Sequence, residues 1–162
     1  MSDPQNEETL PAVGVLSDLG DAVREKLAAA GEFVTLPEGN YLAIQGQFPD
    51  HLSFILSGTV SVKSHANGDT VELAKLGAGE SVGEMSTIDP RPASANARTS
   101  EETKIWRISP DDFDTFLESD KEVGYVIMKA LAKTLVNRIR LDTERSLREE
   151  DRRHSQGFEA DY

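Results

Sequence analysis

The sequence predicts a mainly β fold with flanking helices, in which an antiparallel sheet or barrel lies between an N-terminal helix and C-terminal helices. Two patterns in the residues point this way. Between Glu32 and Ser109, short apolar or alternating runs are cut by turn residues, which is typical of an antiparallel sheet or barrel. On both sides of this region, apolar residues recur at helical spacing.

The first helical segment follows a polar start. Residues 1–14 carry Pro4 and Pro11 without periodicity, and we expect them to form a disordered leader. Apolar residues then recur at three- and four-residue steps: Leu16, Leu19, Val23 and Leu27. Asp21 is suited to cap a helix start and Gly31 to end it, so one or two short helices open a domain that we expect to span 15–141.

The strand region contains seven segments that the residue pattern marks as strands. They are 33–36, 41–45, 52–56, 59–63, 70–76, 93–98 and 103–108. The dipeptide Asn67-Gly68 separates two of them, and both residues tolerate the positive φ of a tight turn. This predicts a β-hairpin.

The C-terminal helices begin at Ser109, which can cap a helix that has Pro110 in its first turn. After Ser119 a second helix carries an apolar stripe: Met128, Leu131, Leu135 and Ile139. Residues 142–162 are mostly charged and are expected to be a helix extension or a disordered tail. The interaction residues proposed on this helix are Leu131, Leu135 and Ile139, although the stripe can equally pack on the barrel.

Composition narrows the function classes. Asp and Glu number 29 against 17 Lys and Arg, and the net charge of -12 disfavours nucleic acid and anionic membranes as partners. The chain has no cysteine, no secretory signal and no apolar run long enough to span a membrane, so we expect a cytoplasmic protein. His51, His65 and His154 fit no metal spacing, and nucleophile-elbow, P-loop and paired-carboxylate motifs are missing, so we expect neither an enzyme nor a metal site.

The segment Gly79–Ser86 is the first candidate for ligand chemistry. Glycines let backbone N–H groups approach a ligand, and the Glu84 carboxylate can accept a hydrogen bond from a ribose hydroxyl. The alternative is a tight turn with a solvated glutamate. Gly77, Gly79 and Gly83 have the wrong spacing for a dinucleotide fingerprint, and no long helix follows them.

The order of several blocks resembles the cyclic-nucleotide-binding domain family, of the catabolite activator and protein kinase A regulatory subunit type. The blocks are PEGNYLAIQGQ, FILSGTVSV, LGAGESVGEMSTIDPRPASA, WRISPDDF and a helix ending NRIR. The resemblance runs from about Leu16 to Arg140. It implies an eight-stranded jelly-roll barrel in which a short cassette holds cAMP or cGMP.

The resemblance also assigns roles within the cassette. It implies that Glu84 takes the ribose 2'-hydroxyl and that amides near Gly83 approach the cyclic phosphate. The family places an arginine nine positions after this glutamate, where this sequence has Ala93, so the cassette is degenerate in the ungapped register. Arg91, two residues away, is near enough to swing toward the site.

The remaining cassette residues allow more than one interpretation. Ser94 either donates its amide to phosphate or is simply a small residue, Asn96 either meets a purine edge or faces solvent, and Met85 is expected to pack in the core. The candidate ligand-binding set is Val82, Gly83, Glu84, Met85, Ser86, Arg91, Ala93, Ser94, Ala95 and Asn96.

Two functions are compatible with these sequence features. The first is a stand-alone, non-enzymatic sensor that binds a cyclic nucleotide or a related molecule and signals through its C-terminal helix to a protein partner or in a homodimer. The second is a ligand-free domain that serves as a protein–protein interaction scaffold, which Ala93 favours.

Overall fold

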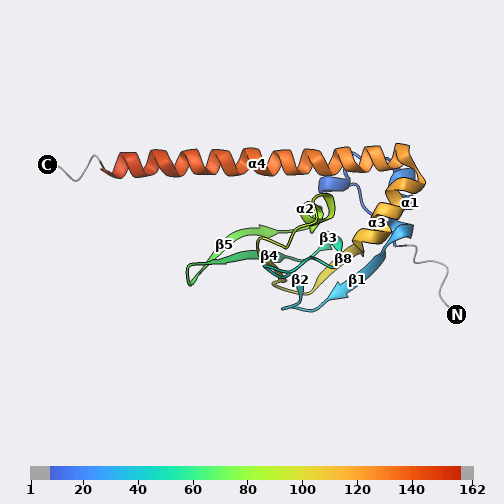
Figure 1. The fold of residues 1–162 in the computed structure, drawn as a ribbon, viewed down its shortest axis with the longest axis horizontal. Coiled ribbons are helices and arrows are strands. Elements are labelled where there is room, and N and C mark those ends of the chain that lie inside the picture. Colours follow the sequence, from blue (N-terminus) through green and yellow to red (C-terminus); the bar gives the residue numbers. More distant parts are fainter. Residues whose placement is uncertain (1–7, 158–162) are drawn as a thin grey trace.

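The computed structural model describes residues 8–157, which form a β-barrel flanked by helices (Figure 1). The helices are η1 (Gly14–Leu16), α1 (Asp21–Ala30), α2 (Glu84–Ile88), α3 (Pro110–Ser119) and α4 (Lys121–Gly157). The strands are β1 (Glu32–Leu36), β2 (Tyr41–Ala43), β3 (Leu52–Ser57), β4 (Val60–Ala66), β5 (Asp69–Leu76), β6 (Ser81–Val82), β7 (Asn96–Thr99) and β8 (Thr103–Ile108).

The strands form two four-stranded sheets. Their orders are β1-β8-β3-β6 and β2-β7-β4-β5, and all the pairs are antiparallel. The predicted jelly roll with an N-terminal helix and C-terminal helices is therefore confirmed. The predicted hairpin is also present, because β4 and β5 are joined by Asn67 and Gly68 with φ of 54° and 85°.

Two apolar clusters hold the fold together. The larger joins the helices to the sheet β1-β8-β3-β6 around Trp106, which is fully buried and stacks on Phe54 with ring centroids 5.4 Å apart. The Trp106 indole N–H donates to the Ala28 carbonyl at 3.2 Å, which satisfies its one polar group. The smaller cluster fills the barrel between the sheets and includes Ile55 and Val60.

The helices begin close to where the sequence predicts. Ser109 caps α3 by accepting a hydrogen bond from the Asp112 amide at 3.2 Å, with Pro110 as the first helical residue. Asp21 is the first residue of α1 and not its cap, a position taken by Gly20. Helix α4 is continuous for 37 residues and runs across the barrel and beyond it (Figure 1), so the charged segment up to Gly157 is helical.

The structure differs from the sequence prediction at residues 8–14, at β6 and at α2. Residues 8–14 are not a loose leader, because Leu10 is buried in the larger cluster and Glu8 forms an ion pair with Lys104 at 2.6 Å. Residues 1–7 and 158–162 of the two predicted polar ends lie outside the described residues. Strand β6 and helix α2, at two and five residues, are too short to produce a periodic pattern, and both were missed.

Within residues 8–157, no helix combines the length and the apolar character needed to cross a membrane.

Candidate functional site

The cassette is built on a sharp corner between β6 and α2. Gly83 occupies this corner with φ of 89°, a left-handed conformation that favours glycine. A Cβ atom at position 83 would lie 2.4 Å from the His51 carbonyl oxygen, so the chain passes too close for any side chain there. Glycine is therefore required at this position, and it sets the direction in which Glu84 enters the protein.

A cavity of about 310 Å³ opens beside this corner. Its volume lies at the lower end of the range of about 300–1,000 Å³ that is typical of small-molecule sites. Nine of the ten predicted cassette residues line it: Val82, Gly83, Glu84, Met85, Ser86, Arg91, Ala93, Ser94 and Ala95. The apolar part of the cavity wall is formed by Ala43, Val62 and Leu76.

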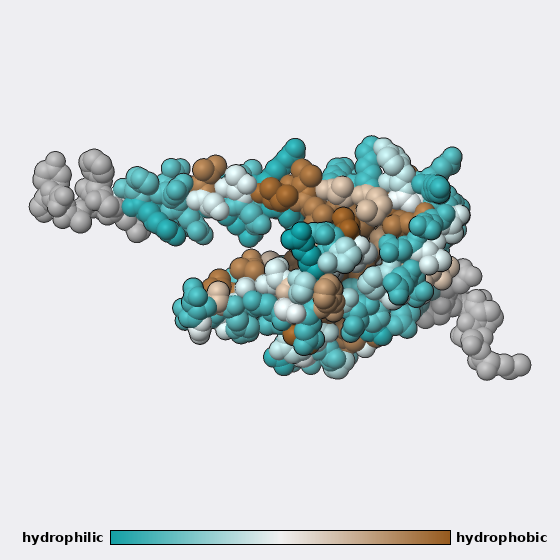
Figure 2. All heavy atoms as spheres, in the orientation of Figure 1, coloured by the Kyte–Doolittle hydropathy of each residue, from teal (hydrophilic) through white to brown (hydrophobic). Residues whose placement is uncertain are grey.

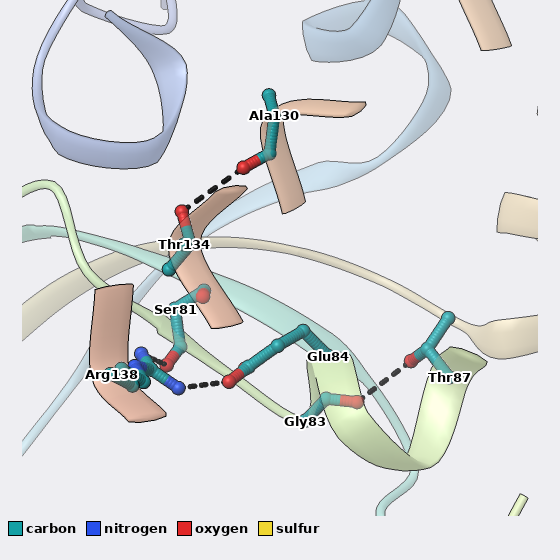
Figure 3. A network of polar contacts seen from close by, with 7 residues as sticks. All are labelled: Ser81, Gly83, Glu84, Thr87, Ala130, Thr134 and Arg138. Atoms are coloured by element: carbon teal, nitrogen blue, oxygen red, sulfur yellow. Dashed lines mark hydrogen bonds and ion pairs between the residues drawn. The ribbon is translucent and has the colours of Figure 1, made fainter. Parts of the chain in front are cut away.

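Glu84 is the central polar group of the cavity. Its side chain is only 3% exposed, and Oε1 forms an ion pair with the guanidinium of Arg138 from α4 (Figure 3). Arg138 also donates to the Ser81 carbonyl at 2.9 Å. The second carboxylate oxygen of Glu84, Oε2, is buried without a hydrogen-bond partner in the described structure, as is Ser81 Oγ. Buried polar atoms normally have a hydrogen-bond partner, so these two atoms are exceptions within the described structure.

The positive charges that line the cavity come from Arg91 and Arg138, since Ala93 supplies none. Arg91 lines the cavity, but its side chain is 78% exposed and its Nε is 2.8 Å from Asp89 Oδ2. The backbone of Ala93 is already bonded to the loop before β3: its amide donates to Gln47 and its carbonyl accepts from Gly46, both at 2.8 Å. The two arginines of the cavity, Arg91 and Arg138, are thus each paired with a carboxylate.

Met85 lies away from its expected position in the core, and Asn96 adopts the outward-facing one of its two predicted orientations. Asn96 does not line the cavity, because its side-chain oxygen accepts a hydrogen bond from the Gln45 amide at 2.9 Å and the residue faces the outside of the barrel. Met85 is 62% exposed at the cavity mouth instead of packing in the core, since it stands in the first turn of a short helix on the surface. Ser94 is exposed and lines the cavity.

The predicted interaction helix separates into a buried and an exposed part. Leu131 is fully buried in the larger cluster and is not available to a partner, because α4 presents this side to the rest of the domain. Leu135 is half-buried, and Ile139 is 66% exposed. Apolar side chains remain visible along α4 in Figure 2, and the exposed ones include Val136, Ile139, Leu141 and Leu147.

Sequence reasoning missed Arg138 as a site residue. Basic and acidic side chains are interspersed toward the C-terminus of the chain, so charge alone does not single out Arg138. The available signal was its spacing: Arg138 follows Leu131 by seven residues and Thr134 by four, so it continues the side of α4 that faces the barrel. What it meets there depends on where α4 crosses the barrel.

Two further observations concern protonation and metals. Burial lowers the pKa of His51 below its ordinary value of 6.5, and the positive charge of Arg107 lowers it further. The negative charges of Asp50 and Glu32 raise this pKa but do not outweigh the other two effects, so the imidazole is neutral at pH 7. Within residues 8–157, no group of three or more His, Asp or Glu side chains is arranged to hold a metal ion.

Comparison with known proteins agrees with this geometry. The family model described as "Cyclic nucleotide-binding domain" matches residues 33–120. The chain is 34% identical over 120 residues to the Pycsar effector protein XpPycTIR of Xanthomonas perforans, covering 74% of this chain and 38% of that one. It is 25% identical over 130 residues to the CRP-like cAMP-activated global transcriptional regulator of Mycobacterium tuberculosis, covering 80% of this chain and 58% of the regulator.

A solved structure gives the same result for the fold. A cyclic nucleotide-binding domain from Methylobacillus flagellatus superimposes with a TM-score of 0.76 at 29% identity, covering 81% of this chain and 74% of that one. The chain spans less than two thirds of the length of the two curated relatives named above. The matched segment includes every strand from Phe33 onward, α2 and α3, and the chain therefore belongs to the cyclic nucleotide-binding domain family.

Proposed function

We propose that this chain is a non-enzymatic regulatory domain that binds a nucleotide-like small molecule in the cassette cavity and signals through α4. The observation that carries the proposal is Glu84 Oε2, a buried carboxylate oxygen without a partner in the described part of the chain, beside a cavity of suitable size. A ribose hydroxyl can donate to this oxygen, as the family resemblance implies. cAMP and cGMP are the ligands to test first.

The phosphate of such a ligand requires a positive charge that Ala93 cannot supply. Arg91 is the group that we assign to it, because it lines the cavity two residues before Ala93. Its ion pair with Asp89 is exposed on both sides, and exposed pairs contribute only about 0–1 kcal/mol. Arg91 can therefore exchange Asp89 for a phosphate at a low cost in free energy. In this proposal the cassette keeps the glutamate of the family at Glu84 and has its arginine at position 91 instead of 93.

Signalling follows from the contact between Glu84 and α4. A ligand hydroxyl that approaches Glu84 enters the neighbourhood of Arg138, so binding and the position of α4 are energetically linked. The ligand shifts α4 only to the extent that it binds one position of the helix better than the other. The output passes to a protein partner or a second copy of the chain, through the exposed side of α4 at Val136 and Ile139. A cytoplasmic location is part of this proposal.

The second candidate is a ligand-free interaction scaffold. Two observations favour it: Ala93 stands where the family has its phosphate-binding arginine, and Arg138 already occupies one oxygen of Glu84. In this case the cavity is a structural remnant and α4 remains an interaction surface.

Calorimetric titration with cAMP, cGMP and adenosine distinguishes the two candidates. The sensor predicts saturable binding of a cyclic nucleotide that weakens in Glu84→Gln and in Arg91→Gln, while adenosine binds more weakly because it has no phosphate. Arg140→Gln is the matched control, since Arg140 is exposed on α4 and does not line the cavity. If none of the three binds at submillimolar concentration, the scaffold is favoured and the sensor is rejected.

The partner surface is tested separately by light scattering. A homodimer through α4 predicts twice the monomer mass at high concentration and a return to the monomer mass in Ile139→Asp. If the chain is a monomer at every concentration, the homodimer is excluded and the proposed partner of α4 is a different protein.

A further inference from the structure

A second hollow lies on the outer face of the sheet β2-β7-β4-β5. Its volume is about 640 Å³, and polar side chains form most of its wall. Strand alternation separates it from the cassette cavity: Val62 and Ala97 line the cassette, whereas Lys63 and Arg98, their neighbours in the chain, line the outer hollow. The two sites therefore lie back to back on one sheet.

Lys63 and Arg98 bring two positive charges together in this hollow. They are diagonal neighbours on paired strands, because Lys63 is opposite Asn96 and Arg98 is opposite Ser61. Diagonal positions of this kind lie about 7–8 Å apart, close enough for both side chains to reach one anion. Within residues 8–157 neither of them forms an ion pair, although the chain carries a net charge of -12.

Two acidic residues lie near the hollow, and neither forms an ion pair with Lys63 or Arg98 in the described part of the chain. Glu72 faces Lys63 across the β4–β5 pair, but its carboxylate accepts a hydrogen bond from Ser61 at 3.1 Å and lies 3.9 Å from Lys75. Glu38 lines the hollow without pairing with either cation. The two like charges repel each other, and an anion placed between them would relieve this repulsion.

Arg98 is oriented before any ligand arrives. Its Nε donates to the Gly39 carbonyl at 2.9 Å, and its guanidinium carbon lies 5.3 Å from the centre of the Tyr41 ring. These contacts leave the two terminal nitrogens without a hydrogen-bond partner in the described part of the chain. A guanidinium presented in this way is suited to bidentate contact with a phosphate.

Further polar groups complete the wall of the hollow. Thr70 and Ser100 line it, as does His65, whose Nδ1 lies 2.7 Å from the Thr70 hydroxyl and whose backbone amide is held by Gln45 at 2.8 Å. The volume is that of a small-molecule site, and the acidic chain around it opposes a long polyanion. The lining matches a small anion that also carries hydroxyl groups.

We propose that this outer hollow is a second binding site, for a small phosphate ester with a hydroxyl-rich body. Arg98 and Lys63 hold the phosphate, and the hydroxyl, amide and imidazole groups around them meet the body. The site does not use Glu84 or any other side chain that lines the cassette cavity, so it stands whether or not the cassette binds a nucleotide.

Backbone-amide NMR of the full chain, titrated with ribose 5-phosphate, tests the proposal. We expect saturable shifts at Lys63, His65 and Arg98, weaker binding at higher salt, and weaker binding still of ribose or inorganic phosphate alone. Loss of a charge-assisted contact in Arg98→Gln or Lys63→Gln is expected to weaken binding about ten-fold. Lys121→Gln, which removes the same charge from an exposed position of α4 outside the hollow, is expected to leave the affinity unchanged.

The remaining outcomes decide against the proposal. It is overturned if ribose 5-phosphate gives no saturable shifts at millimolar concentration, if ribose binds equally well, or if Lys121→Gln weakens binding as much as Lys63→Gln. Equal affinity for inorganic phosphate would overturn the assignment of a phosphate ester.

Glu84→Gln separates the two sites, since it is expected to reduce nucleotide binding in the cassette and to leave the shifts at Arg98 intact.

Discussion

The ion pair between Glu84 and Arg138 leads to a quantitative prediction for Arg138→Ala. Breaking a buried pair by removing one partner costs about 3–5 kcal/mol, because the other charge stays buried. The Glu84 side chain is 3% exposed, but that of Arg138 is 32% exposed, so solvent screening reduces the expected cost to about 1–3 kcal/mol. Loss of the Arg138 bond to the Ser81 carbonyl adds about 0.5–1.5 kcal/mol.

A double-mutant cycle isolates the ion pair from the other contacts of Arg138. Glu84→Gln keeps the shape of the side chain and removes its charge, so Arg138→Ala in that background should cost only about 1 kcal/mol. The expected coupling between the two positions is therefore about 1–3 kcal/mol. Urea denaturation at neutral pH, followed by circular dichroism, gives the four free energies of unfolding. Arg140→Ala is the control, with an expected change within about 0.5 kcal/mol.

Additivity would refute this reasoning. If the two changes add within about 0.5 kcal/mol, the ion pair contributes nothing to stability. The proposed link between the cassette and α4 would then lose its energetic basis, even if a ligand still binds near Glu84.

Three further predictions concern stability. Leu131→Ala should lower the free energy of unfolding by about 2–5 kcal/mol because it leaves a cavity in the core, whereas Ile139→Ala in the monomer should change it by less than about 0.5 kcal/mol, both measured by urea denaturation. Gly83→Ala should cost about 2 kcal/mol or more, because it combines a φ of 89° with a clash against the His51 carbonyl, and thermal unfolding reports it. Asp120 accepts hydrogen bonds from Lys26 and from the Val123 amide in the first turn of α4, and these bonds lower its pKa below the ordinary value of 3.8. The stability that the Asp120 charge supplies is therefore fully present above pH 3.8 and is lost as the pH falls through the lowered pKa, which urea denaturation at a series of acidic pH values reports.

The glycine and aspartate predictions have matched controls. Gly77→Ala is the control for Gly83→Ala, since a Cβ atom at position 77 would meet nothing within 4 Å and the backbone there has no positive φ. An equal loss of stability in both variants would reject the steric argument. Asp120→Asn keeps a helix-capping side chain but removes the charge. Its stability deficit relative to the wild type should shrink as the solution is acidified, and a deficit that is independent of pH would contradict the prediction.

Local signals in the chain were sufficient for several features of the fold. The hairpin at Asn67-Gly68 and the start of α3 at Ser109-Pro110 both depend on backbone preferences that act over two to four residues. The cassette glycine was also identifiable from its block, and Gly83 stands at the corner where the family resemblance places it. These features do not depend on what the rest of the chain does.

Features that depend on packing were not predictable in the same way. Met85 has an apolar side chain, but it stands at the mouth of the cavity, and Leu10 lies in a polar leader yet is buried in the core. Asn96 belongs to the cassette strand but faces the opposite side of the sheet, because its place in the β4–β7 register decides its direction. A shift of one residue in that register would have reversed it.

The sequence by itself determined the fold class, the order of the main elements, the position of Gly83 and Glu84, and the absence of an arginine at position 93. Local conformational preference, residue identity and the family resemblance of the ordered sequence blocks are sufficient for these. Only the tertiary structure decided that α4 brings Arg138 to Glu84, which are 54 residues apart, and that Lys63 and Arg98 share a hollow on the outer face of the sheet. Both arrangements depend on the path of one element across another, which the sequence pattern of either element alone does not contain.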